Sequence, residues 1–132
     1  MRMVFADTFF FLAILNPSDP AHRRASALSR SLQQPRITTA WVLTEVGDAL
    51  ARDNRRAFLD LMQLLRTNPL IRVVEPSLEL FTAGVAFYAS RPDKDWPLTD
   101  CISFVVMERE GIRDAITEDH HFEQAGFTAL LK

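Results

Sequence analysis

Two patterns of hydrophobic residues alternate along this chain. Short apolar segments rich in Val, Ile, Phe and Thr predict buried strands at 2–6, 36–39, 70–74, 115–117 and 127–131. Longer segments, in which apolar residues recur every three or four positions, predict helices at about 9–15, 20–33, 40–50, 53–66, 76–90 and 97–111. This alternation predicts an α/β fold with a central parallel sheet of about five strands flanked by helices.

One of the predicted helices is more apolar than one buried face requires. The run 9–15 is apolar all round. In the helix that begins at Pro76, we expect the apolar residues to face inward, namely Leu78, Phe81, Val85 and Tyr88. We expect self-association through the first two helices or through the helix after Pro76.

Length and composition fit one soluble globular domain, residues 1–132. Hydrophobic residues make up 48% and charged residues 24% of the 132 positions. No apolar run approaches the roughly 20 residues that a membrane helix needs, and the N-terminus does not look like a signal peptide. Cys101 is the single cysteine, which excludes an internal disulfide and favours a small buried residue over a nucleophile. We therefore expect a cytoplasmic protein with no membrane segment.

Four carboxylates fall where a parallel sheet brings residues together. Asp7 ends the first predicted strand and Asp119 follows the fourth, while Glu45 lies in the helix after the second strand. Asp100 lies in the first turn of the helix that leads into the fourth strand, and we expect it to face out of that packed helix. With right-handed connections, all four lie at the edge where open parallel sheets bind ligands.

Such a cluster predicts a metal site, because four crowded carboxylates repel one another and no matching set of arginines stands beside them. Oxygen ligands favour Mg²⁺ or Mn²⁺, which activate water and stabilise charge on a phosphate during hydrolysis. Asp7 and Asp100 are the first candidates for ligands. Glu45 would bind metal or orient the attacking water, and Asp119 would complete the outer shell.

Each candidate also has a structural interpretation. Asp7 and Asp100 would serve as helix caps, Glu45 as a surface acid and Asp119 as a turn residue. For Asp93 and Asp95, turn and capping roles are favoured over metal binding. For His120 and His121, a metal or general-base role is disfavoured, because adjacent side chains are expected to point apart and residues 118–122 are predicted to form an exposed loop or helix turn.

The order of these motifs resembles the PIN domain over essentially the whole chain. The motifs are Asp7, Thr44-Glu45, Leu98-Thr99-Asp100, Thr117-x-Asp119-x-x-Phe122 and a near-terminal Gly126-Phe127. The chain is most similar to the small PIN proteins of the VapC toxin kind.

The resemblance implies a ribonuclease that depends on Mg²⁺ or Mn²⁺, is usually dimeric and is often neutralised by a small antitoxin. It implies that Asp7, Glu45, Asp100 and Asp119 form the metal site, with Thr8 or Thr99 in support. The net charge is −2, but a group of arginines follows the Glu45 helix. We expect Arg52, Arg55 and Arg56 to form the rim that holds the RNA backbone.

Two other functions remain open. A catalytically silent PIN-like module would bind RNA or a protein without cleaving it, and metal-dependent cleavage separates this case from the enzyme. An aspartyl-phosphate receiver also uses an Asp at a strand end. It usually carries a second Asp two positions later, where this chain has Phe9, and a Lys late in the sheet, where only Lys132 is available.

Overall fold

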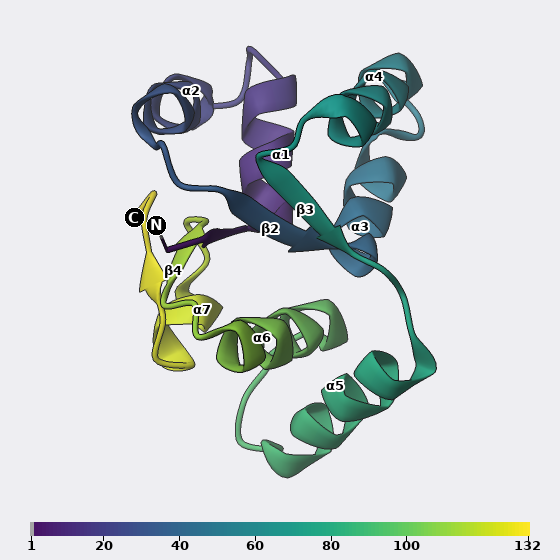
Figure 1. Ribbon diagram of the computed structural model, residues 1–132, viewed down its shortest axis with the longest axis vertical. Coiled ribbons are helices and arrows are strands. Elements are labelled where there is room, and N and C mark those ends of the chain that lie inside the picture. The colour runs from purple at the N-terminus through teal and green to yellow at the C-terminus, as the bar shows by residue number, and fades with distance from the viewer. Residues whose placement is uncertain (1) are drawn as a thin grey trace.

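A sheet of five parallel strands organises the computed structural model, which describes residues 2–132 (Figure 1). The strand order is β3-β2-β1-β4-β5. The strands are β1 (Val4–Ala6), β2 (Arg36–Thr39), β3 (Ile71–Val74), β4 (Asp114–Ile116) and β5 (Thr128–Ala129). The predicted fold class is confirmed, although β5 is shorter than the predicted segment.

Helices cover both faces of the sheet. They are α1 (Thr8–Leu15), α2 (His22–Ser31), α3 (Ala40–Leu50), α4 (Arg55–Thr67), α5 (Leu78–Ser90), α6 (Leu98–Glu110) and α7 (His120–Gln124). Figure 1 shows α1, α2 and α4 on one side of the sheet and α5 and α6 on the other. α7 occupies the segment for which the sequence predicted a loop or helix turn.

The order of the strands places a switch point beside β1. The chain runs outward from β1 through β2 to β3, and then returns to the other side of β1 to form β4 and β5. β1 pairs with both β2 and β4, and its residue Phe5 is fully buried. In sheets of this kind the carboxyl ends of the strands at the switch point form the ligand site.

Local capping explains where several helices begin and end. The side chains of Ser77 and Asn54 accept hydrogen bonds from the backbone N–H groups of Leu80 and Ala57, so α5 and α4 each start two residues later than predicted. α6 ends at Gly111, whose φ of 68° is the left-handed conformation that glycine adopts readily. This end agrees with the sequence prediction.

The prediction of which residues of α5 face inward is wrong. Leu78, Phe81, Val85 and Tyr88 are all exposed, Leu78 to 79% and Tyr88 to 53%. The helix instead packs on α6 through Leu80, Gly84 and Phe87. The reason is close approach, because a Cβ atom at Gly84 would lie only 2.3 Å from Cγ1 of Ile102 in α6.

An aromatic cluster fixes α6 against α7 and the loop before α6. The ring of Phe104 in α6 lies 4.9 Å from the ring of Phe122 in α7 and 5.2 Å from that of Trp96, measured between centroids. Phe122 and Trp96 are both buried. Because Asp100 lies one turn before Phe104, and Asp119 and His121 lie just before Phe122, this cluster sets the positions of these polar residues relative to one another.

Candidate active site

The four acids named from the sequence converge at the carboxyl edge of the sheet. Asp7 follows β1, Asp119 follows β4, Glu45 lies in the second turn of α3 and Asp100 lies in the first turn of α6. All four line one hollow of about 420 Å³. The other residues of its wall are Thr8, Phe9, Leu12, Pro97 and Glu118.

Asp7 is buried, with 4% of its surface exposed. Its Oδ2 accepts a hydrogen bond from the hydroxyl of Thr117, over 2.9 Å. Its Oδ1 is buried without a hydrogen-bond partner among the described residues. Asp7 stands at the N-cap position of α1, but its side chain makes no capping hydrogen bond there. Since a buried carboxylate oxygen normally has a partner, this atom points to a ligand that comes from outside the chain.

Asp100 was expected to face out of α6, and this is wrong, because only 5% of it is exposed. The residues from Asp100 to Phe104 are all buried, because α5 covers one side of α6 and the sheet covers the other. Its carboxylate lies within hydrogen-bond distance of the ring of His121, with 3.1 Å between Nδ1 and Oδ2.

Thr8 and Glu45 form a second polar pair in the hollow. The Thr8 hydroxyl donates to Oε1 of Glu45 over 2.5 Å, which fixes one carboxylate oxygen and leaves the other for a further contact. Thr99 is the other expected supporting residue, and it is not one of the described residues that line the hollow. Its carbonyl accepts a hydrogen bond from Ser103 within α6.

Asp119 is less buried, with 31% of its side chain exposed. Its Oδ1 accepts the backbone N–H of His121 over 2.9 Å, so the residue caps α7 and lines the hollow at the same time. Its own N–H donates to the Thr117 hydroxyl, which in turn donates to Asp7. Thr117 thus connects the acids that follow β1 and β4, a role that sequence reasoning missed although the motif that it begins was noted.

The expectation that the two histidines lie in an exposed loop and point apart is also wrong. Their ring centroids are 4.5 Å apart, and the His121 side chain is only 18% exposed, whereas that of His120 is 60% exposed. His121 Nδ1 lies 3.2 Å from Asp119 Oδ1 as well as near Asp100. Asp119, His120 and His121 also place ligand atoms within 4.8 Å of one another.

Burial and mutual repulsion disfavour the ionised forms of the carboxyl groups in this hollow. Burial, followed by the charge of Asp100, raises the pKa of Asp7 from 3.8 to about 7, although the hydrogen bond from Thr117 opposes the shift. Burial, followed by the charges of Asp119 and Glu45, raises the pKa of Asp100 to about 7 as well. A bound cation would relieve both effects. The unpartnered Asp7 oxygen and the set of carboxylate donors fit Mg²⁺ or Mn²⁺.

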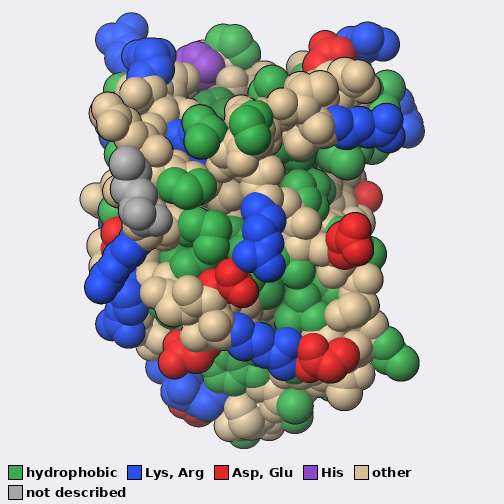
Figure 2. Space-filling model, in the orientation of Figure 1, with side chains coloured by type: hydrophobic (Ala, Val, Ile, Leu, Met, Phe, Trp, Pro, Cys, Tyr) green, Lys and Arg blue, Asp and Glu red, His purple; other side chains and the backbone are tan. Residues whose placement is uncertain are grey.

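The three arginines expected to hold RNA do not line this hollow. Arg55 begins α4 and lines a different hollow with Thr44 and Asp48 of α3. Arg56 pairs with Asp60, and Arg52 is exposed in the turn between α3 and α4. Figure 2 shows Lys and Arg side chains at both upper corners, over α2 and α4, and charges of both signs below them.

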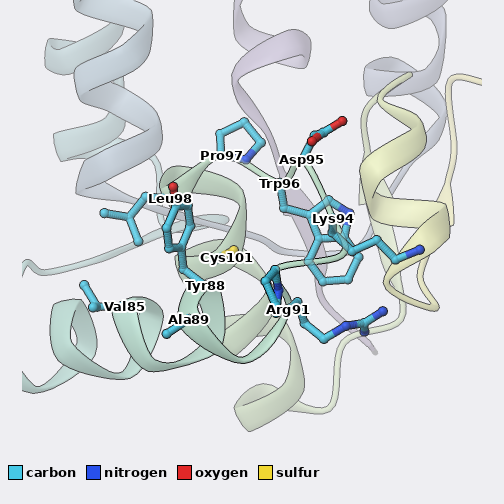
Figure 3. Close-up of a pocket in the computed structure, with 11 residues that line it drawn as sticks. Val85, Tyr88, Ala89, Arg91, Lys94, Asp95, Trp96, Pro97, Leu98 and Cys101 are labelled. Carbon is cyan, nitrogen blue, oxygen red and sulfur yellow. The ribbon is translucent and has the colours of Figure 1, made fainter.

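A larger groove of about 800 Å³ lies between α5 and the loop before α6 (Figure 3). It shares Pro97 with the four-acid hollow. Arg91 and Lys94 reach over the Trp96 ring, at 5.0 and 6.0 Å from its centroid. Asp93 pairs with Arg91 and Asp95 lines the groove, so neither acid joins the four.

Comparisons with known proteins give a consistent picture. No family model matches the chain. The chain is 28% identical over 128 residues to the 23S rRNA-specific endonuclease VapC20 of Mycobacterium tuberculosis, a match that covers 97% of this chain and 98% of the relative. The crystal structure of M. tuberculosis VapC20, described as a sarcin-ricin loop cleaving toxin, superposes with a TM-score of 0.88 at 27% identity. It covers 96% of this chain and 98% of that one.

Two more distant structures share the fold. VapBC2 from Rickettsia felis, bound to a DNA fragment from its promoter, matches with a TM-score of 0.68 at 8% identity and covers 97% of both chains. FitAcB from Neisseria gonorrhoeae matches with a TM-score of 0.64 at 17% identity, over 96% of this chain and 95% of that one. Among residues 2–132, no helix is both long and apolar enough to cross a membrane.

Proposed function

We propose that this chain, which is similar to the VapC toxins in sequence and has their PIN-like fold, is a divalent-metal-dependent endoribonuclease and the toxin of a toxin–antitoxin pair. One observation of this structure supports the proposal most strongly. Two buried carboxylates, Asp7 and Asp100, meet in one hollow, and an Asp7 oxygen there has no partner within the described chain. We propose that residues 1–132 form a single PIN-like domain around this hollow.

Asp7, Glu45, Asp100 and Asp119 are the proposed catalytic and metal-holding residues. When bound, Mg²⁺ or Mn²⁺ supplies an activated water and offsets the charge that develops on the phosphate. Thr8 holds one oxygen of Glu45, so that the other can accept a proton from the water that attacks phosphorus. Thr117 holds one oxygen of Asp7 and the N–H of Asp119, which keeps these two acids in place during the reaction.

RNA is the proposed substrate, and Arg52, Arg55 and Arg56 are the proposed rim for its backbone. Their position around the start of α4, next to the helix that carries Glu45, suits a strand that passes through the four-acid hollow. Changing all three to Gln should weaken RNA binding for every sequence and flatten its salt dependence. A control with the same change in charge, at Arg23, Arg30 and Arg66, should keep the parent slope, and an unchanged slope in the first variant would contradict this role.

The proposed protein partners are a small antitoxin and a second copy of the chain. Self-association is proposed through the outer face of α5, because Leu78, Phe81, Val85 and Tyr88 form one exposed apolar stripe. We place the activity in the cytoplasm, where the proposed RNA substrate is found.

A cleavage assay tests the proposed reaction. Purified protein is incubated with intact ribosomes, with transfer RNA and with messenger RNA, each in Mn²⁺, in Mg²⁺ and in chelator. We expect cleavage only with metal, and none with Asp7→Asn. Ribosomal RNA is the first substrate to examine, because the relative VapC20 is specific for 23S rRNA. Equal cleavage in chelator would contradict the metal-dependent mechanism, whereas RNA binding without any cleavage would favour the silent PIN-like module.

A further inference from the structure

His121 contacts two of the acids that line the hollow, and the proposed mechanism gives it no role. It lies in the first turn of α7, and its Nδ1 is 3.1 Å from Asp100 Oδ2 and 3.2 Å from Asp119 Oδ1. Its side chain is mostly buried, whereas the neighbouring His120 is largely exposed and lies 3.7 Å from Asp119. One of two adjacent histidines is therefore built into the site, and the other lies at its edge.

The hydrogen-bond pattern identifies Asp100 as the acceptor of the ring proton. When Asp100 is ionised, as a carboxylate that binds a cation must be, it can only accept a hydrogen bond, so the His121 ring then donates the single hydrogen of Nδ1. Asp119 Oδ1 already accepts the backbone N–H of His121 over 2.9 Å. Asp100 Oδ2 is the nearer of the two oxygens to Nδ1. The ring thus completes a contact to Asp100, while the backbone of the same residue holds Asp119.

Packing fixes the donor and the acceptor to each other. Phe122, next to His121, is fully buried, and its ring lies against Phe104 of α6 and Phe5 of β1. Asp100 lies one turn before Phe104 in the same helix. The aromatic contact therefore sets the distance between the His121 ring and the Asp100 carboxylate independently of any ligand.

We propose that His121 is a positioning residue, which donates from Nδ1 to Asp100 and holds that carboxylate in the orientation that binds a divalent cation. The inference rests on the proposed metal-dependent function and adds a residue to it. A carboxylate that has its orientation fixed before metal arrives loses less freedom on binding. Loss of such an outer-shell hydrogen bond typically costs 10- to 100-fold in metal affinity or activity.

Three substitutions at one position separate the hydrogen bond from the bulk of the ring. In His121→Asn the side-chain amide places an N–H close to the position of Nδ1, in His121→Gln it places one near Nε2, and His121→Ala has none. Mn²⁺ binding to each full-length protein is measured by titration calorimetry, with circular dichroism to confirm folding. His120→Ala is the matched control in the same helix turn.

We expect roughly 10- to 100-fold weaker Mn²⁺ binding in His121→Ala and His121→Gln, and binding within about threefold of the parent in His121→Asn and His120→Ala. In RNA cleavage, kcat should fall for the first two variants while KM for RNA stays near that of the parent. Rescue by Asn is the decisive result, because a role in packing alone would favour Gln, which is closer to His in size.

The outcomes also separate this inference from the proposed function. A parent that binds Mn²⁺, together with a His121→Ala variant that binds it equally well, would overturn the role of His121 and leave the metal site intact. A parent that binds no Mn²⁺ would overturn both. A nitrogen coupling to Mn²⁺ in the electron spin-echo spectrum of the parent, lost in His121→Asn, would make the ring a direct ligand and overturn the hydrogen-bond role.

Discussion

The two packed helices α5 and α6 depart from the usual pattern of burial in opposite directions. α6 carries a carboxylate, Asp100, into the interior, while α5 presents Leu78, Phe81, Val85 and Tyr88 to solvent. A buried charge is costly unless something neutralises it, and a contiguous exposed apolar stripe is unusual unless something covers it. Each departure therefore fits one of the proposed partners, a cation on the side of α6 and a protein surface on the side of α5.

The largest expected effect comes from removing the buried charge in α6. Asp100→Asn should reduce RNA cleavage by roughly 100-fold or more and abolish the rise in melting temperature that Mn²⁺ gives the parent. In chelator the variant should be as stable as the parent or more stable, because the repulsion that Asp119 and Glu45 exert on Asp100 is lost. Thermal unfolding of both proteins, with Mn²⁺ and with chelator, measures this.

Asp93→Asn is the control, because Asp93 is exposed, pairs with Arg91 and lies outside the hollow. It should keep both the cleavage and the response to Mn²⁺. A parent indifferent to Mn²⁺, together with an Asp100→Asn protein that is destabilised in chelator, would instead make Asp100 a structural residue that complements the α6 dipole.

On the α5 side, a charge placed in the exposed stripe should prevent self-association. Val85→Glu sets a carboxylate in the middle of the stripe, and we expect the dimer to weaken by roughly 10- to 100-fold, as for a central interface residue. Sedimentation at micromolar concentration should show a dimer for the parent and a 15.0 kDa species for the variant. Leu59→Glu, at an exposed apolar residue of α4, is the control. Dissociation by that control alone would move the interface to α4.

The buried acids should also make the metal-free protein lose stability as pH rises. Because the pKa values of Asp7 and Asp100 are raised from 3.8 to about 7, the folded state holds more protons than the unfolded state between these values. The free energy of unfolding therefore falls as pH rises through that window and levels off above it. Each acid contributes about 1.4 kcal/mol per pH unit from pH 5 to its raised pKa, so we expect a loss of roughly 2–5 kcal/mol between about pH 5 and pH 8.

Urea unfolding in chelator measures this slope, and Asp7→Asn should flatten it. The lowered pKa values of Glu79 and Asp93 give the opposite slope, but only below the ordinary range of carboxyl groups, so they do not disturb the window. Saturating Mn²⁺ should remove most of the effect, because the bound ion keeps both acids ionised. Stability that increases from pH 5 to pH 8 in chelator would show that burial does not hold these acids in their protonated form.

The fold class and the clustering of the four acids could be predicted from the sequence, because both depend on the order of strands and helices along the chain. Once strands and helices alternate, the residues after β1 and β4 must share an edge of the sheet, whatever the details of packing. The same reasoning placed Glu45 and Asp100 near them. Thr117 and His121 were harder to assign, because their roles depend on the direction of a hydroxyl and on a five-residue helix that the sequence left as a loop or helix turn.

The buried face of α5 could not be predicted from the spacing of its apolar residues alone. The positions of Leu80, Gly84 and Phe87 follow helical spacing as well as those of the exposed stripe, so the pattern offered two faces and did not decide between them. The residue that decides is Gly84, because it lets the two helix axes approach. A glycine in the middle of a helix, where it weakens the helix itself, was the signal for close packing.

The smallest of the expected effects tests that contact between the two helices. On helix propensity alone, Gly84→Ala should stabilise the protein by up to about 1 kcal/mol. The new Cβ would lie 2.3 Å from Cγ1 of Ile102, however, so a helix or a side chain must shift. We expect a net loss of about 1–3 kcal/mol in urea unfolding, as for other overpacked cores. Ala86→Gly, at an exposed position of α5, measures how much the difference in helix propensity between Ala and Gly changes the free energy of unfolding in the same helix. If Gly84→Ala stabilises the protein, α5 is not tightly docked on α6, and the exposure of its apolar stripe would then reflect loose packing rather than a surface kept for a second chain.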